Sequence, residues 1–378
     1  MVIRLFQPFL GQEELAAVQS CFDRAWIGLG PKVTEFESAW EKHLGCNEAV
    51  ALNSATAALH LALRVFGFKS GSKVLVPSMT FSATASAVLY NDLRPVFVDS
   101  DPKTLGMCLE DLDEKYDEEC VAVIPVHYAG HPVAMERLVP WARDKNLKII
   151  EDCAHTTGST YMGRALGTWG DIGCFSFEEK KLMTTGDGGM ICSDDKDLLK
   201  DVRAMRWVGI DKDNWKTAKS YTNSDKDAMH WYYEVSKLGF KYNMNDLAAS
   251  IGLVQLQRLE YMNNTRADII GRYIERLSDL GELEFLVPYE PENYVYQMFG
   301  VRVPIKNEFI IGLKSLGIST GCHYTPLSIQ PLFREFGGRC PYIEREVDRC
   351  VTLPLHVRLT FDDVDFICDN VRRLLAPS

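Results

Sequence analysis

A lysine that precedes a glycine-rich turn is the feature of this sequence that most directly suggests chemistry. The run is Phe175-Ser176-Phe177-Glu178-Glu179-Lys180-Lys181-Leu182-Met183-Thr184-Thr185-Gly186-Asp187-Gly188-Gly189. Glycines permit close backbone approach and conformations that a Cβ atom would block. A lysine amine enclosed in such a site can form an imine with an aldehyde and can then carry protons. Because most lysines are solvated surface charges, the run by itself marks only a candidate.

A carboxylate at the end of a predicted strand offers a second chemical group. Asp152 closes the apolar run in Lys148-Ile149-Ile150-Glu151-Asp152-Cys153-Ala154-His155. A carboxylate in this place can pair with the protonated nitrogen of a pyridine cofactor and so keep the ring an electron acceptor. The same pattern also suits a metal ligand or a helix cap, so the interpretation needs support from elsewhere in the chain.

The third feature is a turn of small residues at the start of a predicted helix. Its sequence is Asn53-Ser54-Ala55-Thr56-Ala57-Ala58-Leu59. Free backbone N–H groups at a helix N-terminus, together with the hydroxyl groups of Ser54 and Thr56, suit a phosphate. An ordinary serine or threonine N-cap has the same pattern. Phosphate binding is therefore a hypothesis that depends on the other two features.

Alternating strands and helices are predicted to position these three features. The apolar, continuous and β-branched runs predict buried strands at 73–77, 95–99, 121–126, 147–152, 173–177 and 189–193. Helices are predicted between them at 57–66, 83–89 and 134–145. This alternation favours an α/β fold with a mostly parallel sheet, whose ligands bind at the carboxyl ends of the strands.

The pattern changes after residue 195. Residues 196–232 are aromatic and charged, which indicates a long irregular excursion. Two long helices are predicted over 244–280, and the later part shows strands at 299–305 and helices at 307–316 and 361–375. We therefore predict a large α/β domain over residues 1–260 and a smaller α+β domain over residues 261–378.

Composition narrows the function classes. The chain has 378 residues, of which 46% are hydrophobic and 25% charged, and a net charge of -11. This acidic balance argues against binding to nucleic acid or to a membrane surface. The 11 cysteines lack any C-x-x-C pair, which favours free thiols in a reducing compartment. With no signal-peptide pattern and no apolar run of membrane-spanning length, a cytoplasmic location is expected.

Seven motifs occur in an order that resembles the DegT/DnrJ family of sugar aminotransferases. They are N-S-A-T-A-A-L, P-S-M-T-F-S-A-T-A, P-V-F-V-D, H-Y-A-G-H-P, E-D-C-A-H, F-S-F-x-x-x-K-x-x-T-T-G-D-G-G and G-F-K-Y-N-M-N-D-L-A-A. The resemblance extends over about residues 5–375. It implies the fold type I architecture of enzymes that use pyridoxal 5'-phosphate (PLP), with a mostly parallel central sheet flanked by helices and a smaller C-terminal α+β domain.

The resemblance also implies which residues hold PLP. The family's Schiff-base lysine lies five residues after the serine of the Phe-Ser-Phe motif, a spacing that selects Lys181 rather than Lys180. Asp152 matches the partner of the pyridinium nitrogen. His155 lies where the family has glutamine or histidine near the ring oxygen, and Phe81 matches an aromatic residue that stacks on the ring.

Other matched residues lie near the phosphate group. Ser176 matches a serine that contacts the phosphate, and Ala55 with Thr56 matches the small-residue and threonine pair of the turn that begins at Ser54. Asn243 matches a residue that reaches the phosphate bound in the neighbouring subunit. The resemblance therefore implies a homodimer with shared active sites.

The substrate side has fewer signals. The candidates are Trp26, Ile27, Gly28, His323 and Tyr324. The segment 321–327 resembles a family segment that lines the substrate pocket, although a hydrogen-bonded core histidine is an equal interpretation of His323. Relatives often carry His-Gly where this chain has Trp207-Val208-Gly209-Ile210, so the identity of the substrate stays open.

The implied reaction is a PLP-dependent transamination. An amino acid, expected to be L-glutamate, would give its amino group to the cofactor, and pyridoxamine 5'-phosphate (PMP) would pass it to a keto sugar, expected to be nucleotide-linked. Products of this kind feed surface polysaccharides such as lipopolysaccharide, or glycosylated metabolites. The alternatives are an aminotransferase for a cyclitol ketone or a small phosphorylated ketone, and a non-catalytic PLP-binding regulatory protein, which an intact Lys181 and Asp152 disfavour.

A metal site is not expected. His127 and His131 are four positions apart, but Gly130 and Pro132 interrupt any helix that would place them on one face.

Overall fold

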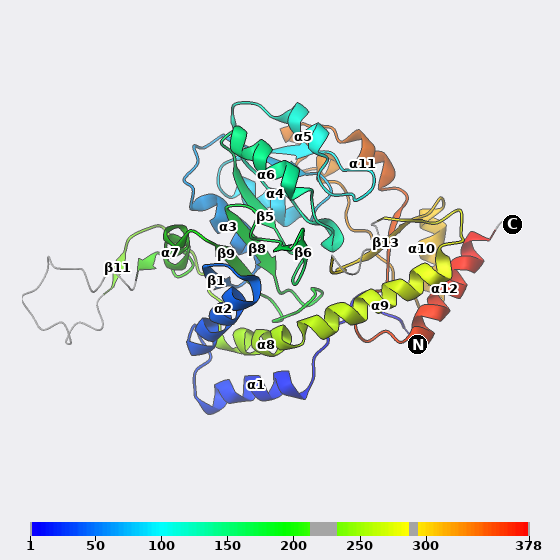
Figure 1. Cartoon of the computed structure of the whole chain (residues 1–378), viewed down its shortest axis with the longest axis horizontal. Helices are drawn as coiled ribbons and strands as arrows, with labels where there is room; N and C mark the ends of the chain where they lie inside the picture. The colour runs from blue at the N-terminus through cyan, green and yellow to red at the C-terminus, as the bar shows by residue number, and fades with distance from the viewer. Residues whose placement is uncertain (1, 212–232, 287–293, 377–378) are drawn as a thin grey trace, which may run out of the picture.

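A seven-stranded sheet forms the centre of the molecule in the computed structural model, which describes residues 2–211, 233–286 and 294–376 (Figure 1). The strands in spatial order are β1 (Glu48–Leu52), β9 (Gly189–Ser193), β8 (Ile172–Ser176), β5 (Lys148–Asp152), β4 (Cys120–Val123), β2 (Lys73–Pro77) and β3 (Arg94–Val98). All neighbours from β8 to β3 pair in parallel, whereas β9 runs antiparallel to both β8 and β1. The predicted, mostly parallel α/β sheet is therefore confirmed.

Both faces of this sheet are covered, which explains the continuous apolar runs in the sequence. Every residue of β8 and β9 is buried. Alternate residues enter opposite hydrophobic clusters: Ile150 packs in one cluster and Ile149 in the other. The helices that follow the strands are α3 (Ala55–Arg64), α4 (Ser82–Leu89), α5 (Leu109–Lys115) and α6 (Met135–Asp144).

Helix α7 (Lys196–Met205) corrects the expectation that residues 196–232 are irregular. Asp195 caps the helix by accepting two backbone N–H groups, and Leu199 and Val202 are buried at helical spacing. The charged residues between these apolar positions obscured the pattern. The rest of the predicted excursion includes the short strand β10 (Ile210–Asp211), which pairs with β11 (Glu234–Val235) just beyond it. Residues 212–232 lie outside the described residues.

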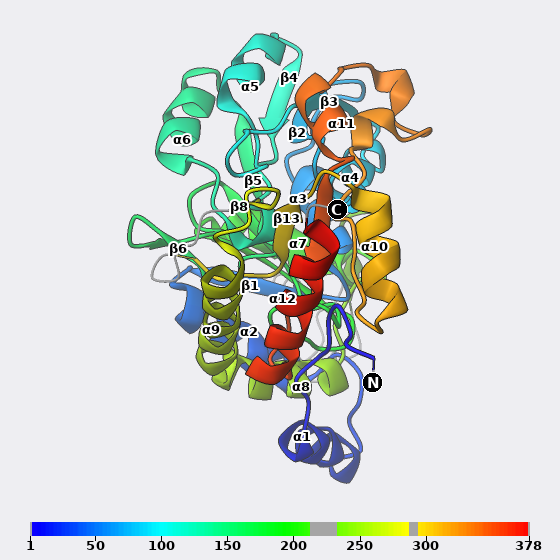
Figure 2. The same ribbon diagram turned by 90° about the vertical axis from the view of Figure 1, so that its right-hand side faces the viewer.

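The second half of the chain contains a smaller, three-stranded antiparallel sheet. Its strands are β12 (Glu284–Phe285), β13 (Phe299–Arg302) and β14 (Cys350–Leu353). The predicted helices there are confirmed as α8 (Asp246–Gln257), α9 (Leu259–Leu277), α10 (Lys306–Ser315) and α12 (Phe361–Leu375), and α11 (Pro341–Glu346) is an additional short helix. Figure 2 shows α12 between α9 and α10, and it packs against both.

The N-terminal segment joins this smaller sheet region to the rest of the chain. Ile3 forms a parallel bridge with Ile318, and the chain then continues into α1 (Gln12–Asp23) and α2 (Pro31–Leu44), both of which pack on α8. Among the residues that the structure describes, no helix combines the length and the apolar character needed to cross a bilayer.

Candidate active site

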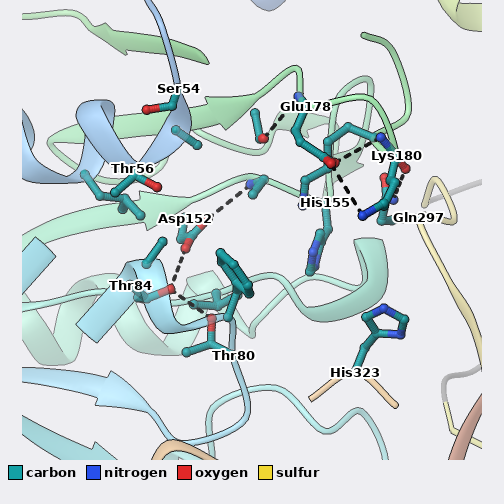
Figure 3. Close-up of a pocket in the computed structure, with 18 of the residues that line it drawn as sticks. Ser54, Thr56, Thr80, Thr84, Asp152, His155, Glu178, Lys180, Gln297 and His323 are labelled. Atoms are coloured by element: carbon teal, nitrogen blue, oxygen red, sulfur yellow. Dashed lines mark hydrogen bonds and ion pairs between the residues drawn. The ribbon is translucent and has the colours of Figure 1, made fainter. Parts of the chain in front are cut away.

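A cavity of about 350 Å³ opens where several strands of the large sheet end (Figure 3). Asp152 and Ser176 are the last residues of β5 and β8, and Ser54 follows β1 by two positions. The residues that line the cavity include Ser54, Ala55, Thr56, Thr80, Phe81, Thr84, Asp152, His155, Ser176, Lys181, His323 and Tyr324. The structure therefore brings together most of the residues that the sequence indicated.

Asp152 is buried in the floor of the cavity and held there by hydrogen bonds. Its Oδ2 accepts from the Thr84 hydroxyl at 2.9 Å, and its Oδ1 accepts from the Ala154 N–H at 3.2 Å. Thr84 in turn lies 2.9 Å from the Thr80 hydroxyl, a chain that is visible in Figure 3. Burial raises the pKa of Asp152, while the Thr84 hydrogen bond opposes this rise. A buried carboxylate of this kind is stabilised by a cationic partner.

The two adjacent lysines differ sharply in their surroundings. The Lys180 side chain is 56% exposed, and its amine lies 3.7 Å from Glu178. Lys181 lines the cavity, and its amine has no hydrogen-bond or ion-pair partner among the described residues. Burial lowers the pKa of Lys181 to about 8, against the opposing charge of Asp152. A substantial neutral fraction near physiological pH makes this amine a nucleophile.

One end of the cavity is formed by three adjacent strands. Across them, Ser176 pairs with Gly189 and Gly189 pairs with Leu52. A Cβ atom on Gly189 would lie 2.4 Å from the Ser54 carbonyl carbon and 2.6 Å from the Ala55 nitrogen, so only glycine allows this approach. Ser54 caps α3 by accepting from a backbone N–H. The first N–H groups of a helix lack partners within the helix and are suited to an anion.

The buried His155 and the half-buried Tyr324 form a pair on the opposite wall. His155 Nε2 lies 3.1 Å from the Tyr324 hydroxyl, whereas His155 Nδ1 is buried with no hydrogen-bond partner among the described residues. Burial and the charge of Lys181 hold the pKa of His155 well below its ordinary value, so the ring is neutral. Phe81 lies beside Tyr324, with ring centroids 5.8 Å apart, and 58% of Phe81 is exposed.

His323 lies at the mouth of the cavity rather than in its floor. Its Nδ1 is 2.9 Å from the Thr352 hydroxyl, and its ring contacts Phe6 edge-on with the centroids 5.4 Å apart. Burial lowers the pKa of His323 to about 4. The side chain is therefore a neutral, hydrogen-bonded histidine that also faces the cavity.

Four of the indicated residues are not in this cavity. Trp26, Ile27 and Gly28 lie in the connection between α1 and α2, where Trp26 and Ile27 are 53% and 51% exposed. Asn243 bridges Leu52 through its backbone, and its side chain donates to the Met244 carbonyl at 3.2 Å. Within one chain, none of the four is among the residues that line the cavity.

Some cavity residues were not identified from the sequence. Thr84 stands in the motif that supplied Phe81, so its spacing offered a signal. Gln297 and Phe6 offered none, since they come from segments far from every motif. Gln297 donates its side-chain N–H to the Lys180 carbonyl at 2.7 Å, while its Oε1 is buried with no partner among the described residues.

A buried group of His127, Glu151 and Cys153 lies behind the cavity, with its potential ligand atoms within 4.8 Å of one another. The polar atoms of His127 and Glu151 form hydrogen bonds within the protein. His127 Nδ1 accepts from the Val133 N–H, and Nε2 donates to Glu151 at 3.1 Å. Both oxygens of Glu151 also accept backbone N–H groups, from residues 167 and 170. These bonds hold the strand end that carries Asp152.

Comparison with known proteins finds relatives that match nearly the whole chain. Two relatives are each 34% identical to the chain: the spore coat polysaccharide biosynthesis protein SpsC of Bacillus subtilis, with 97% of this chain and 96% of that protein covered, and the dTDP-4-dehydro-2,3,6-trideoxy-D-glucose 4-aminotransferase of Saccharopolyspora spinosa, with 98% and 96% covered.

Solved structures show the same architecture over the whole chain. The aminotransferase TlmJ from Streptoalloteichus hindustanus has a TM-score of 0.91 at 32% identity, with 100% of this chain and 99% of that chain covered. Spr1654 from Streptococcus pneumoniae, described as a sugar aminotransferase and solved in PLP and PMP forms, has a TM-score of 0.88 for the PLP form at 28% identity, with 99% of both chains covered.

The family model for the DegT/DnrJ/EryC1/StrS aminotransferases matches residues 8–372. That match covers the large sheet, the cavity and the smaller sheet, so it includes every element described above. The chain therefore belongs to the DegT/DnrJ/EryC1/StrS aminotransferase family and is an aminotransferase.

Proposed function

We propose that this aminotransferase moves an amino group from L-glutamate to the ketone of a nucleotide-linked sugar, in a step toward a surface polysaccharide such as lipopolysaccharide or another glycoconjugate. The observation that carries the proposal is that the Lys181 amine and the buried Asp152 carboxylate line the same cavity. The name of the Saccharopolyspora relative supports a nucleotide-linked keto sugar as acceptor, and that of SpsC supports a polysaccharide destination.

PLP, converted to PMP during turnover, is the cofactor, and the cavity residues fit it. The turn of Ser54, Ala55 and Thr56, with Ser176, would hold the phosphate. His155 Nδ1 is a buried nitrogen without a partner among the described residues, and such an atom is costly unless a ligand supplies a hydrogen bond. The ring oxygen of PLP would supply it.

The residues around the ring would divide the chemistry. When bound, PLP supplies an aldehyde that condenses with amines and a ring that accepts an electron pair. Lys181 would anchor the aldehyde and then take the proton from the α-carbon of the amino donor. Asp152, oriented by Thr84, would keep the positive charge on the ring nitrogen, and Phe81 would cover one face of the ring.

A homodimer is part of the proposal. Asn243 lies outside the cavity of its own chain, so we place it at the phosphate in the partner's cavity. Trp26 and Ile27 are large apolar side chains that are more than half exposed. Adjacent exposed apolar side chains can form part of an interaction surface, so the same dimer would give them and Gly28 a role beside the substrate.

The first experiment is an absorbance spectrum of the purified protein with PLP. Wild type should show the visible band of the bound cofactor, and L-glutamate should convert it to the PMP spectrum. Lys181→Ala should lack the band, and the matched variant Lys180→Ala should keep it. A band that survives in Lys181→Ala but vanishes in Lys180→Ala would move the reactive amine to Lys180. Failure of wild type to bind excess PLP would refute the proposal.

A second experiment tests the acceptor. The PMP form is mixed with a nucleotide-linked keto sugar, a free keto sugar, a cyclitol ketone or a small phosphorylated ketone, and return of the PLP band is followed. The nucleotide-linked sugar should restore the band fastest. If the cyclitol or the phosphorylated ketone restores the band faster, that compound and not the sugar is the natural acceptor.

A further inference from the structure

β1 is an edge strand of the large sheet, and carboxylates occupy part of its outer edge. A single bridge joins its last residue, Leu52, to Asn243, and within the sheet the strand pairs with β9. On the other side, the N–H of Ala49 donates to Glu41 Oε1 at 3.0 Å, and the N–H of Ala51 donates to Glu37 Oε1 at 2.9 Å. Both glutamates come from α2, so this helix satisfies the outward donors that a neighbouring strand would otherwise satisfy.

Two arginines from α7 and its C-cap satisfy the outward carbonyl groups. The Ala49 carbonyl accepts from Arg203 Nη2 at 3.0 Å, and the Ala51 carbonyl accepts from Arg206 Nη1 at 2.8 Å. Glu37 also forms ion pairs with both arginines, and the side chains of Glu37 and Arg206 are only 5% and 6% exposed. We call this set, Glu37, Glu41, Arg203 and Arg206, the edge clasp.

Arg206 also connects the edge clasp to the turn at Ser54 through its backbone. Its carbonyl accepts from the Tyr242 N–H at 2.9 Å, and the Tyr242 carbonyl accepts from the Asn53 N–H at 2.7 Å. Asn53 directly precedes Ser54. The Arg206 side chain therefore binds the Ala51 carbonyl, and its ion pair with Glu37 fixes the backbone carbonyl that reaches Asn53 through Tyr242. Arg203 instead contacts the β1 backbone at Ala49, two positions farther from the turn.

We propose that Arg206 is a positioning residue for the cofactor phosphate, because it fixes the end of β1 from which the Ser54–Thr56 turn begins. Replacing a buried ion pair with well-packed apolar groups often costs no stability, so stability alone does not explain a buried arginine here. We infer that the buried arginine is needed to fix the positions of Ala51 and Asn53. The inference rests on the proposed function in one respect, the binding of phosphate by this turn.

The test compares Arg206→Met with the matched variant Arg203→Met. Titration of the apoprotein gives the dissociation constants of PLP and of pyridoxal, which lacks the phosphate. Arg206→Met should weaken PLP binding about tenfold or more and leave pyridoxal binding within about twofold. Arg203→Met should change both by less than about threefold. Equal weakening of PLP in the two variants, or equal weakening of PLP and pyridoxal in Arg206→Met, would overturn the inference.

Two further measurements keep the test decisive. If Arg206→Met does not fold, Arg206→Lys retains the charge but offers fewer donor directions, and it should show the same selective loss of PLP affinity. Hydrogen exchange in the apoprotein should be faster at the amides of residues 53–57 in Arg206→Lys than in wild type, and unchanged exchange would overturn the inference. If wild type binds PLP no more tightly than pyridoxal, the phosphate role of the turn fails as well, which separates the two proposals.

Discussion

The two ends of the cavity are built in different ways. At the phosphate end, Ser54 follows β1 and Ser176 ends β8. Both strands pair with β9, which lies between them, and this backbone pairing fixes the relative positions of the two serines. At the opposite end, which we call the mouth, Phe6, Gln297 and Tyr324 come from segments far apart in the chain. Side-chain contacts help to hold them: Phe6 lies against His323, Gln297 donates to the Lys180 carbonyl, and Tyr324 lies beside His155. One end depends on a sheet, and the other on side chains.

This difference suggests how the enzyme separates chemistry from substrate choice. Residues fixed by the sheet cannot move without disturbing several strands, so changes there should affect the reaction with every substrate. Residues at the mouth can be exchanged with little effect on the backbone, so changes there should affect one substrate more than another. Function on a shared fold commonly varies in this way, through the loops around a fixed scaffold.

The largest expected effect is at Asp152. Asp152→Asn should lower kcat on the order of 10²–10³-fold with every substrate, since removal of one preorganised electrostatic group has effects of this size. Stopped-flow absorbance would give both half-reactions. Thr84→Val, which removes only a hydrogen bond to this carboxylate, serves as the milder control. A loss confined to the acceptor half-reaction would contradict the division between the two ends.

The next effect is at Gly189. Gly189→Ala places a Cβ atom against the Ser54 and Ala55 backbone, and overpacking of about 1–3 kcal/mol should weaken PLP binding roughly 5- to 150-fold. Titration of the apoprotein measures this change. Gly281 has open space around its Cβ position, so Gly281→Ala should leave PLP affinity unchanged. Similar losses in both variants would mean that the close approach at Gly189 is unimportant.

The pH dependence of cofactor loading gives a smaller effect. The folded pKa of Lys181, about 8, is below its ordinary value, and only the neutral amine attacks the aldehyde. The rate of PLP incorporation should therefore rise with pH up to about 8 and fall about tenfold for each unit below it. The Asp152 charge raises this pKa, so Asp152→Asn should shift the midpoint to lower pH. An unchanged midpoint would show that the two groups do not interact.

The smallest effect is expected at the mouth. Gln297→Leu removes a buried amide that faces the cavity, and it should lower kcat/KM for the sugar acceptor about 3- to 10-fold, the value of one neutral hydrogen bond. PLP affinity should stay within about twofold of wild type. Comparison of several acceptors in the PMP half-reaction would test whether the loss depends on the acceptor. An equal loss of kcat/KM with all acceptors would show that Gln297 behaves like the residues of the phosphate end.

The sequence predicted the sheet-built end better than the mouth. Asp152, Ser176 and the turn at Ser54 follow apolar runs, and strand ends in a parallel sheet must meet, so their clustering followed from local pattern. Gln297 has no local signal, because its place depends on packing between distant segments. Helix α7 was missed because charged residues separate its buried positions. Asn243 shows a further limit, since its predicted partner lies in another chain.

The order in which β1 and the residues of the edge clasp are synthesised has a consequence for folding. Glu37 lies 14 positions before Ala51, but Arg206 follows Ala51 by 155 positions. During synthesis, β1 therefore emerges before Arg203, Arg206 and β9, and until then its outward carbonyl groups have no hydrogen-bond donors from these partners. Open strand edges are templates on which other chains can add. Fragments that end before α7 should consequently aggregate through β1, and in the complete protein the same four side chains prevent strand addition between copies.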